Sequence, residues 1–315
     1  MSLGHIFLVL IPIFFTIILG YLGGYLNIFN ADSSKGLNTL VTKFALPAHL
    51  FIGITTTSKQ TLIDQWPFFL NMFIGIIGFY VILLFISKFV FKYDVTKASM
   101  FSLNSTQPAF AFMGISVLGS LFGQQEVAIP IAITGIVVNA ILDPLATIVG
   151  NIGESNKGKA KDEKGSTIGI ILHGLSEPLA CIPLLAVVLT LCGFHSPEII
   201  QSALDQIGSV TSGVALFAVG VTVGIRKINF QGVAFGISLL KVIVLPLFMI
   251  LVAHLVGLNR ADTVKAILLV AFPGSAVAAM ISTRFDSLTT ETASSFVIST
   301  ILSLITLPIF ITWLI

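Results

Sequence analysis

Charged residues are scarce in this chain of 315 residues. Asp, Glu, Lys and Arg make up 10% of it, whereas they make up about 25% of a typical soluble domain. Hydrophobic residues make up 56%, and the mean hydropathy is +1.04. Too little polar surface remains for a water-soluble protein, so the composition predicts a membrane protein. The net charge of +2, without a basic stripe interleaved with aromatic residues, gives no reason to expect a nucleic-acid partner.

Motifs of catalysis and of metal binding are also missing. The sequence contains no HExxH or P-loop pattern, and its His, Cys and carboxylate residues do not cluster at the spacing of metal ligands. The two cysteines, Cys181 and Cys192, lie on one predicted helix and are separated by roughly 16 Å at about 1.5 Å per residue, which is too far for a disulfide. These absences argue against an enzyme and against a bound cofactor.

What the sequence does contain is a series of apolar runs, each near the roughly 20 residues that a transmembrane helix needs. They predict an all-α polytopic membrane protein with ten transmembrane helices. The predicted spans are 5–26, 37–56, 66–90, 98–121, 127–150, 176–194, 206–225, 231–257, 263–283 and 292–314.

Lysine and arginine gather at one set of span ends and loops. Twelve lie on that side and three on the opposite side, and such positive residues concentrate in the cytoplasm. The bias predicts that both termini lie outside and that the polar segment 151–166 is a cytoplasmic linker. The twelve are Lys35, Lys43, Lys88, Lys92, Lys97, Lys157, Lys159, Lys161, Lys164, Arg226, Lys227 and Arg284, and the three are Lys59, Arg260 and Lys265.

Two of the apolar runs contain a proline among small residues. Pro108 lies in NSTQPAFAFMG (104–114), and Pro273 lies in AFPGSAVAAM (271–280). Proline removes an amide donor and clashes with the preceding turn, so each helix should break there. Broken backbone at membrane depth is tolerated only where protein or a water-filled cavity satisfies its polar groups. Paired interrupted spans therefore indicate the binding site of a transporter.

Proline positions also indicate an internal repeat. Segment 151–166 divides the predicted spans five and five, and an odd number of spans per half gives the two halves opposite orientations. Three prolines of the first half recur 164 to 166 residues later in the corresponding spans. This spacing favours an inverted repeat, from which many secondary transporters are built. The pairs are Pro12 with Pro178, Pro108 with Pro273, and Pro144 with Pro308.

Six small, apolar motifs run through nearly the whole chain. They are FALPAHLF (44–51), PAFAFMGISVLGSLFG (108–123), SEPLACIPLLAVVLTLCGF (176–194), SGVALFAVGVTVG (212–224), LLKVIVLPL (239–247) and VAFPGSAVAAMISTRF (270–285). Their order and spacing resemble the auxin efflux carrier family, which includes bacterial malonate-type permeases. The chain departs from the family at Ala109, where members often have Asn, and at Ser116, where they often have Pro.

The resemblance implies ten helices in two inverted five-helix repeats, with the fourth and ninth helices broken and crossing at a substrate site in the middle of the membrane. It implies a scaffold of residues 1–56 and 167–225. It also implies a transport domain of residues 66–150 and 231–315, which moves relative to the scaffold. A homodimer joined through the scaffold and a place in the bacterial inner (plasma) membrane follow from the same resemblance.

The predicted breaks indicate how an anion would bind. Helices should restart near Phe110 and near Ser275, so two helix N-termini, each with unpaired amides and a partial positive charge, would face the middle of the membrane from opposite sides. Such termini favour a carboxylate. The alternative is that the polar residues only satisfy broken backbone and pack against neighbouring helices. The candidate binding residues are Asn104, Ser105, Thr106, Gln107, Pro108, Ala109, Phe110, Pro273, Gly274 and Ser275.

Asp143 and Lys241 are charged residues inside predicted spans, where charges are rare and usually functional or paired. The helical rise places them at roughly 10 Å and 15 Å from the inner ends of their spans, so an ion pair between them is feasible. They form either a proton- or sodium-responsive switch or a structural pair, and Lys241 is also long enough to reach toward the cytoplasmic surface. Lys241 would in addition help to hold an anionic substrate. His49 and His254 are more simply buried or interfacial imidazoles than proton sites.

Together these features predict a secondary carrier that moves a small organic anion, a mono- or dicarboxylate, by alternating access. A cation/proton antiporter using Asp143 and Lys241 is one alternative. A membrane receptor that binds its ligand without moving it is another. The sequence leaves open whether protons, sodium or no ion is coupled to transport.

Overall fold

The computed structural model describes residues 3–156, 169, 172, 175–225 and 232–315. Over these residues the chain is helical, and its one β pairing is an isolated bridge, which confirms the predicted all-α class. The α-helices are α1 (Leu3–Tyr25), α2 (Ala31–Leu40), α3 (Leu46–Thr55), α4 (Lys59–Asp64), α5 (Trp66–Phe89), α6 (Val95–Thr106), α7 (Phe110–Met113), α8 (Gly119–Phe122), α9 (Gln124–Gly135), α10 (Asp143–Asn156), α12 (Pro178–Leu191), α13 (Glu198–Gly208), α14 (Thr211–Gly224), α15 (Gly232–Leu239), α16 (Leu245–Val256), α17 (Arg260–Ala271), α18 (Ala276–Arg284) and α19 (Thr289–Leu314). Four π-helical segments continue some of them: η1 (Val41–Ala45), η2 (Gly114–Leu118), η3 (Ile136–Leu142) and η4 (Leu240–Val244).

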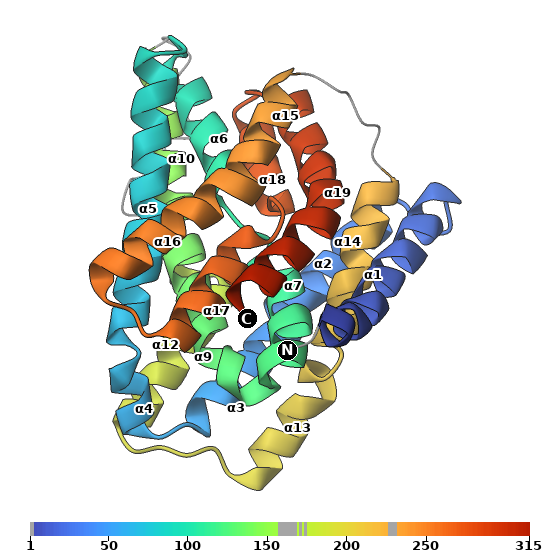
Figure 1. The fold of residues 1–315 in the computed structure, drawn as a ribbon, viewed down its shortest axis with the longest axis vertical. Helices are drawn as coiled ribbons and strands as arrows, with labels where there is room; N and C mark the ends of the chain where they lie inside the picture. Colours follow the sequence, from blue (N-terminus) through green and yellow to red (C-terminus); the bar gives the residue numbers. More distant parts are fainter. Residues whose placement is uncertain (1–2, 157–168, 170–171, 173–174, 226–231) are drawn as a thin grey trace.

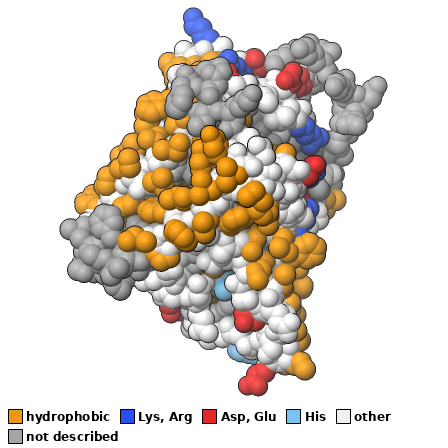
Figure 2. Space-filling model, turned by 90° about the vertical axis from the view of Figure 1, so that its right-hand side faces the viewer, with side chains coloured by type: hydrophobic (Ala, Val, Ile, Leu, Met, Phe, Trp, Pro, Cys, Tyr) orange, Lys and Arg blue, Asp and Glu red, His pale blue; other side chains and the backbone are white. Residues whose placement is uncertain are grey.

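Many of these helices have the length and composition of membrane spans. Within the described residues, six helical stretches are long and apolar enough to cross a membrane, and three shorter apolar stretches accompany them. Large hydrophobic side chains lie exposed along them, and Figure 2 shows such side chains spread over a broad part of one face. In a bilayer these side chains meet lipid, so the fold is that of a multi-pass membrane protein. The six long stretches are Ala31–Thr55, Lys59–Phe89, Gln124–Ser155, Glu198–Gly224, Gly232–Val256 and Thr289–Leu314.

Helix α10 includes the first residues of the linker predicted at 151–166. Helix α10 continues to Asn156 because it packs against the start of α6. The hydroxyl of Thr96 donates a hydrogen bond to the carbonyl of Gly150 at 3.2 Å, and Gly153 has no side chain that would collide with Thr96. Residues 157–166 lie outside the described part of the chain.

Helices α1 and α14 lie side by side (Figure 1) and are in close contact through glycines. A Cβ atom at Gly20 would collide with the carbonyl oxygen of Phe217, and one at Gly220 would collide with that of Ile17. Small residues of this kind allow membrane helices to approach closely. The contact joins the first helix of the chain to a helix of the second half.

Helices α5 and α16 form a second close contact between distant parts of the chain. The amide of Asn71 donates to the sulfur of Met249 at 3.2 Å, and the rings of Phe79 and Phe248 lie 5.4 Å apart, centre to centre. These contacts hold the third and eighth predicted spans together.

Both helix breaks predicted from proline are present. Helix α6 ends two residues before Pro108, and α17 ends two residues before Pro273. The residue before each proline is extended, with Gln107 at φ −69° and ψ 115° and Phe272 at φ −60° and ψ 153°, because a following proline disfavours the helical conformation. The chain resumes as α7 and α18. Both breaks lie in the middle of the molecule (Figure 1).

Candidate functional site

The two broken segments meet in the interior and pair in antiparallel orientation at one isolated bridge; they are here named the crossing (residues 107–109 and 272–275). The amide of Ala109 donates to the carbonyl of Pro273 at 2.9 Å, and Pro108 pairs with Gly274. The amide of Gly274 donates in turn to the hydroxyl of Ser299 on α19 at 3.0 Å. The whole crossing is buried. Each broken segment therefore pairs with backbone polar groups that the other leaves without a helical partner. An apolar medium requires such pairing.

The two helices that leave the crossing begin in different ways. The hydroxyl of Ser275 caps α18 by accepting a hydrogen bond from the amide of Val277 at 3.1 Å. Ala109 stands at the corresponding place before α7, and among the described residues no side chain caps this end. An asparagine there would offer an oxygen to the first-turn amides. The start of α7 therefore keeps amides without a side-chain partner directly beside the crossing.

Asn104 lies one turn before the first break and joins two helices. Its amide nitrogen donates to the carbonyl of Met100 at 2.8 Å. On α18 it reaches the hydroxyl of Ser282 at 2.7 Å and the carbonyl of Ala278 at 3.4 Å. These bonds occupy its donors, so Asn104 supports the crossing from the side of α6.

Three buried oxygen atoms beside the first break have no hydrogen-bond partner among the described residues. They are Oγ1 of Thr106, Oε1 of Gln107 and Oδ1 of Asp143. The amide nitrogen of Gln107 donates to the other carboxyl oxygen of Asp143 at 3.1 Å. Ser105, by contrast, donates to the carbonyl of Phe101 on its own helix at 2.9 Å. Unpaired buried oxygens are unfavourable, and a proton or a cation bound between them would satisfy them.

Lys241 does not form the ion pair with Asp143 that the sequence allowed. No such pair within 4.0 Å joins the two side chains, both of which lie in the described part of the chain. The Lys241 ammonium group instead donates to the carbonyl of Val270 at 2.5 Å, three residues before Pro273, and its side chain is fully buried. The C-terminal end of α17 carries a partial negative charge, which stabilises a cation there.

Metal binding finds no support in the part of the chain that the structure describes. It contains no group of three or more His, Cys, Asp or Glu side chains placed to hold a metal ion. Cys181 and Cys192 are free thiols.

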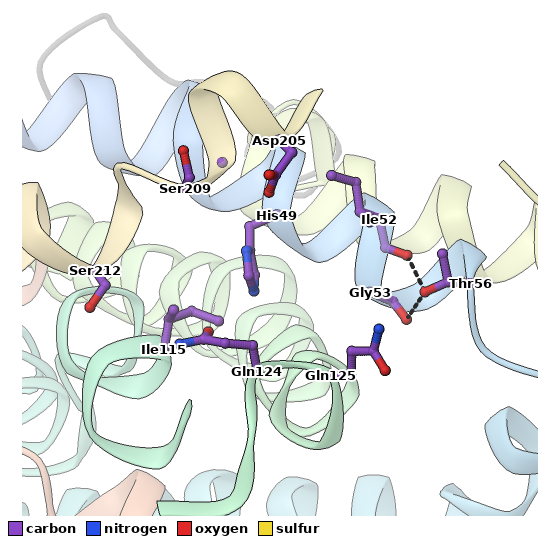
Figure 3. A pocket seen from close by; sticks show the side chains of 11 residues that line it. His49, Ile52, Gly53, Thr56, Ile115, Gln124, Gln125, Asp205, Ser209 and Ser212 are labelled. Carbon is purple, nitrogen blue, oxygen red and sulfur yellow. Dashed lines mark hydrogen bonds between the residues drawn. The ribbon is translucent and has the colours of Figure 1, made fainter. Parts of the chain in front are cut away.

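Sequence reasoning missed a hollow between α3, α9 and α13, here named the His49 hollow (Figure 3). Its volume is about 390 Å³. His49 projects from α3 into it, with Asp205 of α13 on one side and Gln124, at the start of α9, on the other. No spacing pattern links these residues, because they come from three helices far apart in the sequence. His254, the other histidine considered from the sequence, is exposed on α16.

Comparisons with known proteins point to one class. The family model described as "Membrane transport protein" matches residues 5–311. The uncharacterized transporter YfdV of Escherichia coli is 29% identical over 303 residues, which cover 96% of this chain and 95% of that protein. The putative malonate transporter of Rhizobium meliloti is 24% identical over 299 residues, covering 94% and 92%. The lysosomal cholesterol signaling protein of Mus musculus is 26% identical over 322 residues, which cover 96% of this chain and 37% of that protein.

Proposed function

We propose that this chain, which belongs to the membrane transport protein family of the auxin efflux carriers, moves a small organic anion with one or two carboxylates across a membrane by alternating access. The family and the relatives make it a transporter and not an enzyme. One relative is named as a putative transporter of malonate, a dicarboxylate, which is a ligand of the proposed class.

The observation that carries this proposal is the uncapped start of α7 at the buried crossing. A helix N-terminus with free amides and a partial positive charge is a binding site for an anion. Helix α18 begins on the other side of the same crossing. Lys241, when protonated, would add a positive charge near the end of α17, where its one hydrogen-bond partner among the described residues is the carbonyl of Val270. A substrate carboxylate would neutralise this charge.

Two sets of packed helices support a movement of one domain against another. Helices α1 and α14 are joined through glycines, which fits a scaffold of residues 1–56 and 167–225. Helices α5 and α16 are joined through Asn71 and Met249, which fits a transport domain of residues 66–150 and 231–315. In this proposal ten spans form two inverted five-helix repeats in a bacterial inner membrane. Both termini lie outside the cytoplasm, and the scaffold joins two copies of the chain.

Uptake by purified protein in lipid vesicles tests the proposal. Labelled malonate, oxalate and lactate are offered to wild type, Ala109→Asp and Ala109→Asn. The two side chains match in shape, but only the aspartate can place a negative charge where the substrate carboxylate would bind. We expect uptake by wild type, and at least about tenfold less uptake by Ala109→Asp than by Ala109→Asn, a difference of about 1.4 kcal/mol. Equal uptake by the two variants at equal melting temperature contradicts an anion site at this helix start.

A second candidate, exchange of a cation for protons, is favoured by the unpaired oxygens of Gln107 and Asp143. Sodium-for-proton exchange in the same vesicles, abolished in Asp143→Asn and accompanied by no uptake of organic anions, would replace the proposal. Ligand binding without uptake, indifferent to ion gradients, would instead identify a receptor. The mouse relative named as a signaling protein makes that control necessary.

A further inference from the structure

We propose that the His49 hollow is a second binding site, which takes one carboxylate group of a small organic molecule whose remaining part is neutral or positively charged. This inference rests on the proposed function in one respect, because the ligand would be a transported anion on its way to the crossing. Within the proposed substrate class it favours monocarboxylates over dicarboxylates at this second site.

Three side chains that line the hollow can donate or accept hydrogen bonds that no other described residue provides. The side chains of His49, Gln124 and Gln125 form no hydrogen bond with another described residue, and all three face the hollow (Figure 3). His49 is half-buried and the two glutamines are exposed. An imidazole and two primary amides offer several N–H donors, which a carboxylate with its two acceptor oxygens can satisfy together.

Asp205 sets the charge that the rest of the ligand can carry. Gly208 packs against the backbone of His49. A Cβ atom added to Gly208 would lie 3.3 Å from the backbone nitrogen of His49. This close approach of α13 to α3 holds Asp205, one turn earlier, at the exposed rim of the hollow, where it interacts electrostatically with the imidazole. A ligand with a second carboxylate would bring like charges together at this rim, and like charges repel.

The size of the hollow agrees with such a ligand. Its volume of about 390 Å³ equals that of about a dozen water molecules at about 30 Å³ each. It lies near the lower end of the range of about 300–1,000 Å³ that is usual for small-molecule pockets. An acid with a few carbon atoms fits this volume.

One lining residue belongs to the helical segment that starts at the crossing. Ile115 lines it and is about 7.5 Å along the helix from the uncapped start of α7 at Phe110. Next to Ile115, hydrogen bonds between Ser116 and Ser212 join η2 to α14. The Ser212 hydroxyl donates to the Ser116 hydroxyl at 3.0 Å, and the latter lies 3.1 Å from the Ser212 carbonyl oxygen. In the predicted orientation, a ligand in the hollow would wait on the outer side of this contact.

Binding to a protein whose crossing is blocked tests the inference. In Ala109→Asp the added carboxyl group fills the place at the crossing where a substrate carboxylate would bind, so a carboxylate that still binds is expected at another site. Acetate, lactate and alanine are titrated against Ala109→Asp and against two double variants, in which Ala109→Asp is combined with His49→Ala or with Gln124→Ala. The dissociation constants come from the rise in melting temperature. Gln206→Ala and His195→Ala are the matched controls, since neither residue lines the hollow.

We expect at least one of the three probes to bind Ala109→Asp. His49→Ala and Gln124→Ala should weaken that binding at least tenfold, and the two controls should change it less than twofold. Malonate should bind at least tenfold more weakly than the best monocarboxylate, and Asp205→Asn should reduce this difference to threefold or less. Binding that is unaffected by His49→Ala, or absent from Ala109→Asp, overturns the inference. Because this readout is binding, a protein that moves no anion still gives a clear result, and failure of the proposed function can be distinguished from failure of the second site.

Discussion

Replacement of Lys241 by methionine tests whether the charge of this residue serves transport or the stability of the fold. Methionine has a similar length and fills the same buried space, but it carries no charge. It removes the hydrogen bond from the ammonium group to the carbonyl of Val270. It also removes a positive charge from a side chain that is fully buried.

The expected effect on stability is small or favourable. The lost hydrogen bond from a charged group contributes about 1.5–3 kcal/mol, and the lost interaction with the end of α17 contributes about 0.3–2 kcal/mol. Against these losses, the variant no longer buries an ammonium group, which costs several kcal/mol per ion in real proteins. We therefore expect the free energy of unfolding of Lys241→Met to equal or exceed that of wild type.

The expected effect on transport is large. A substrate carboxylate at the crossing would lose its positive partner, and removal of one member of a buried charge pair costs about 2–5 kcal/mol. This corresponds to a loss of about 30- to 5,000-fold in the efficiency of uptake. Uptake into vesicles and thermal unfolding in the same detergent measure the two effects on one preparation.

Lys265 provides the matched control. It is nearly as buried as Lys241 but lies 3.7 Å from Asp262 and from Glu126, away from the crossing. Lys265→Met leaves the buried Asp262 without this cation, so it should lower stability by about 1–3 kcal/mol and leave the efficiency of uptake nearly unchanged. If Lys241→Met is instead less stable than wild type and takes up substrate with unchanged efficiency, Lys241 is a structural residue and the reasoning is refuted.

Variants at Gln107 and at Gly220 test a hydrogen bond beside the crossing and the contact between α1 and α14. Gln107→Leu should lower the free energy of unfolding by about 1–3 kcal/mol, because it leaves the carboxyl group of Asp143 without its hydrogen-bond donor. Adding Asp143→Leu should recover most of this loss. A double-mutant cycle of unfolding in detergent measures the coupling. Gly220→Val should cost about 1–3 kcal/mol by forcing α1 away from α14 at Ile17, whereas Gly213→Val, at a position where an added Cβ atom would have no neighbouring atom within 4 Å, should change the melting temperature little. Equal melting temperatures for the two glycine variants would show that the close helix contact contributes nothing.

Proline chemistry predicted both breaks but does not explain why only these two formed. Other prolines lie inside continuous helices of the described chain and do not interrupt them. What distinguishes Pro108 and Pro273 is that the extended residues around each find hydrogen-bond partners in the other. A break at membrane depth needs such a partner, and the partner is not encoded in the local sequence. The prolines inside helices are Pro12, Pro130, Pro183 and Pro308.

The sequence predicted how far Asp143 and Lys241 lie along their helices, but it did not predict toward which neighbours their side chains point. The helical rise placed Asp143 and Lys241 at levels that allow contact, yet one side chain meets Gln107 and the other meets Val270. The His49 hollow was missed for a related reason. Its polar residues come from separate helices, and only the tertiary packing that turns these helices toward one another brings His49, Gln124 and Asp205 to one cavity.

The mutual pairing at the crossing has a consequence for how the chain is made. The segment around Pro108 enters the bilayer while its partner around Pro273, about 165 residues later, is not yet synthesised. At about 5–20 residues per second, the first segment waits roughly 10–30 s with polar backbone groups exposed to lipid or held by the insertion machinery. We expect the nascent first half to be the stage of biogenesis most exposed to degradation, and its survival to depend on the prompt arrival of the second.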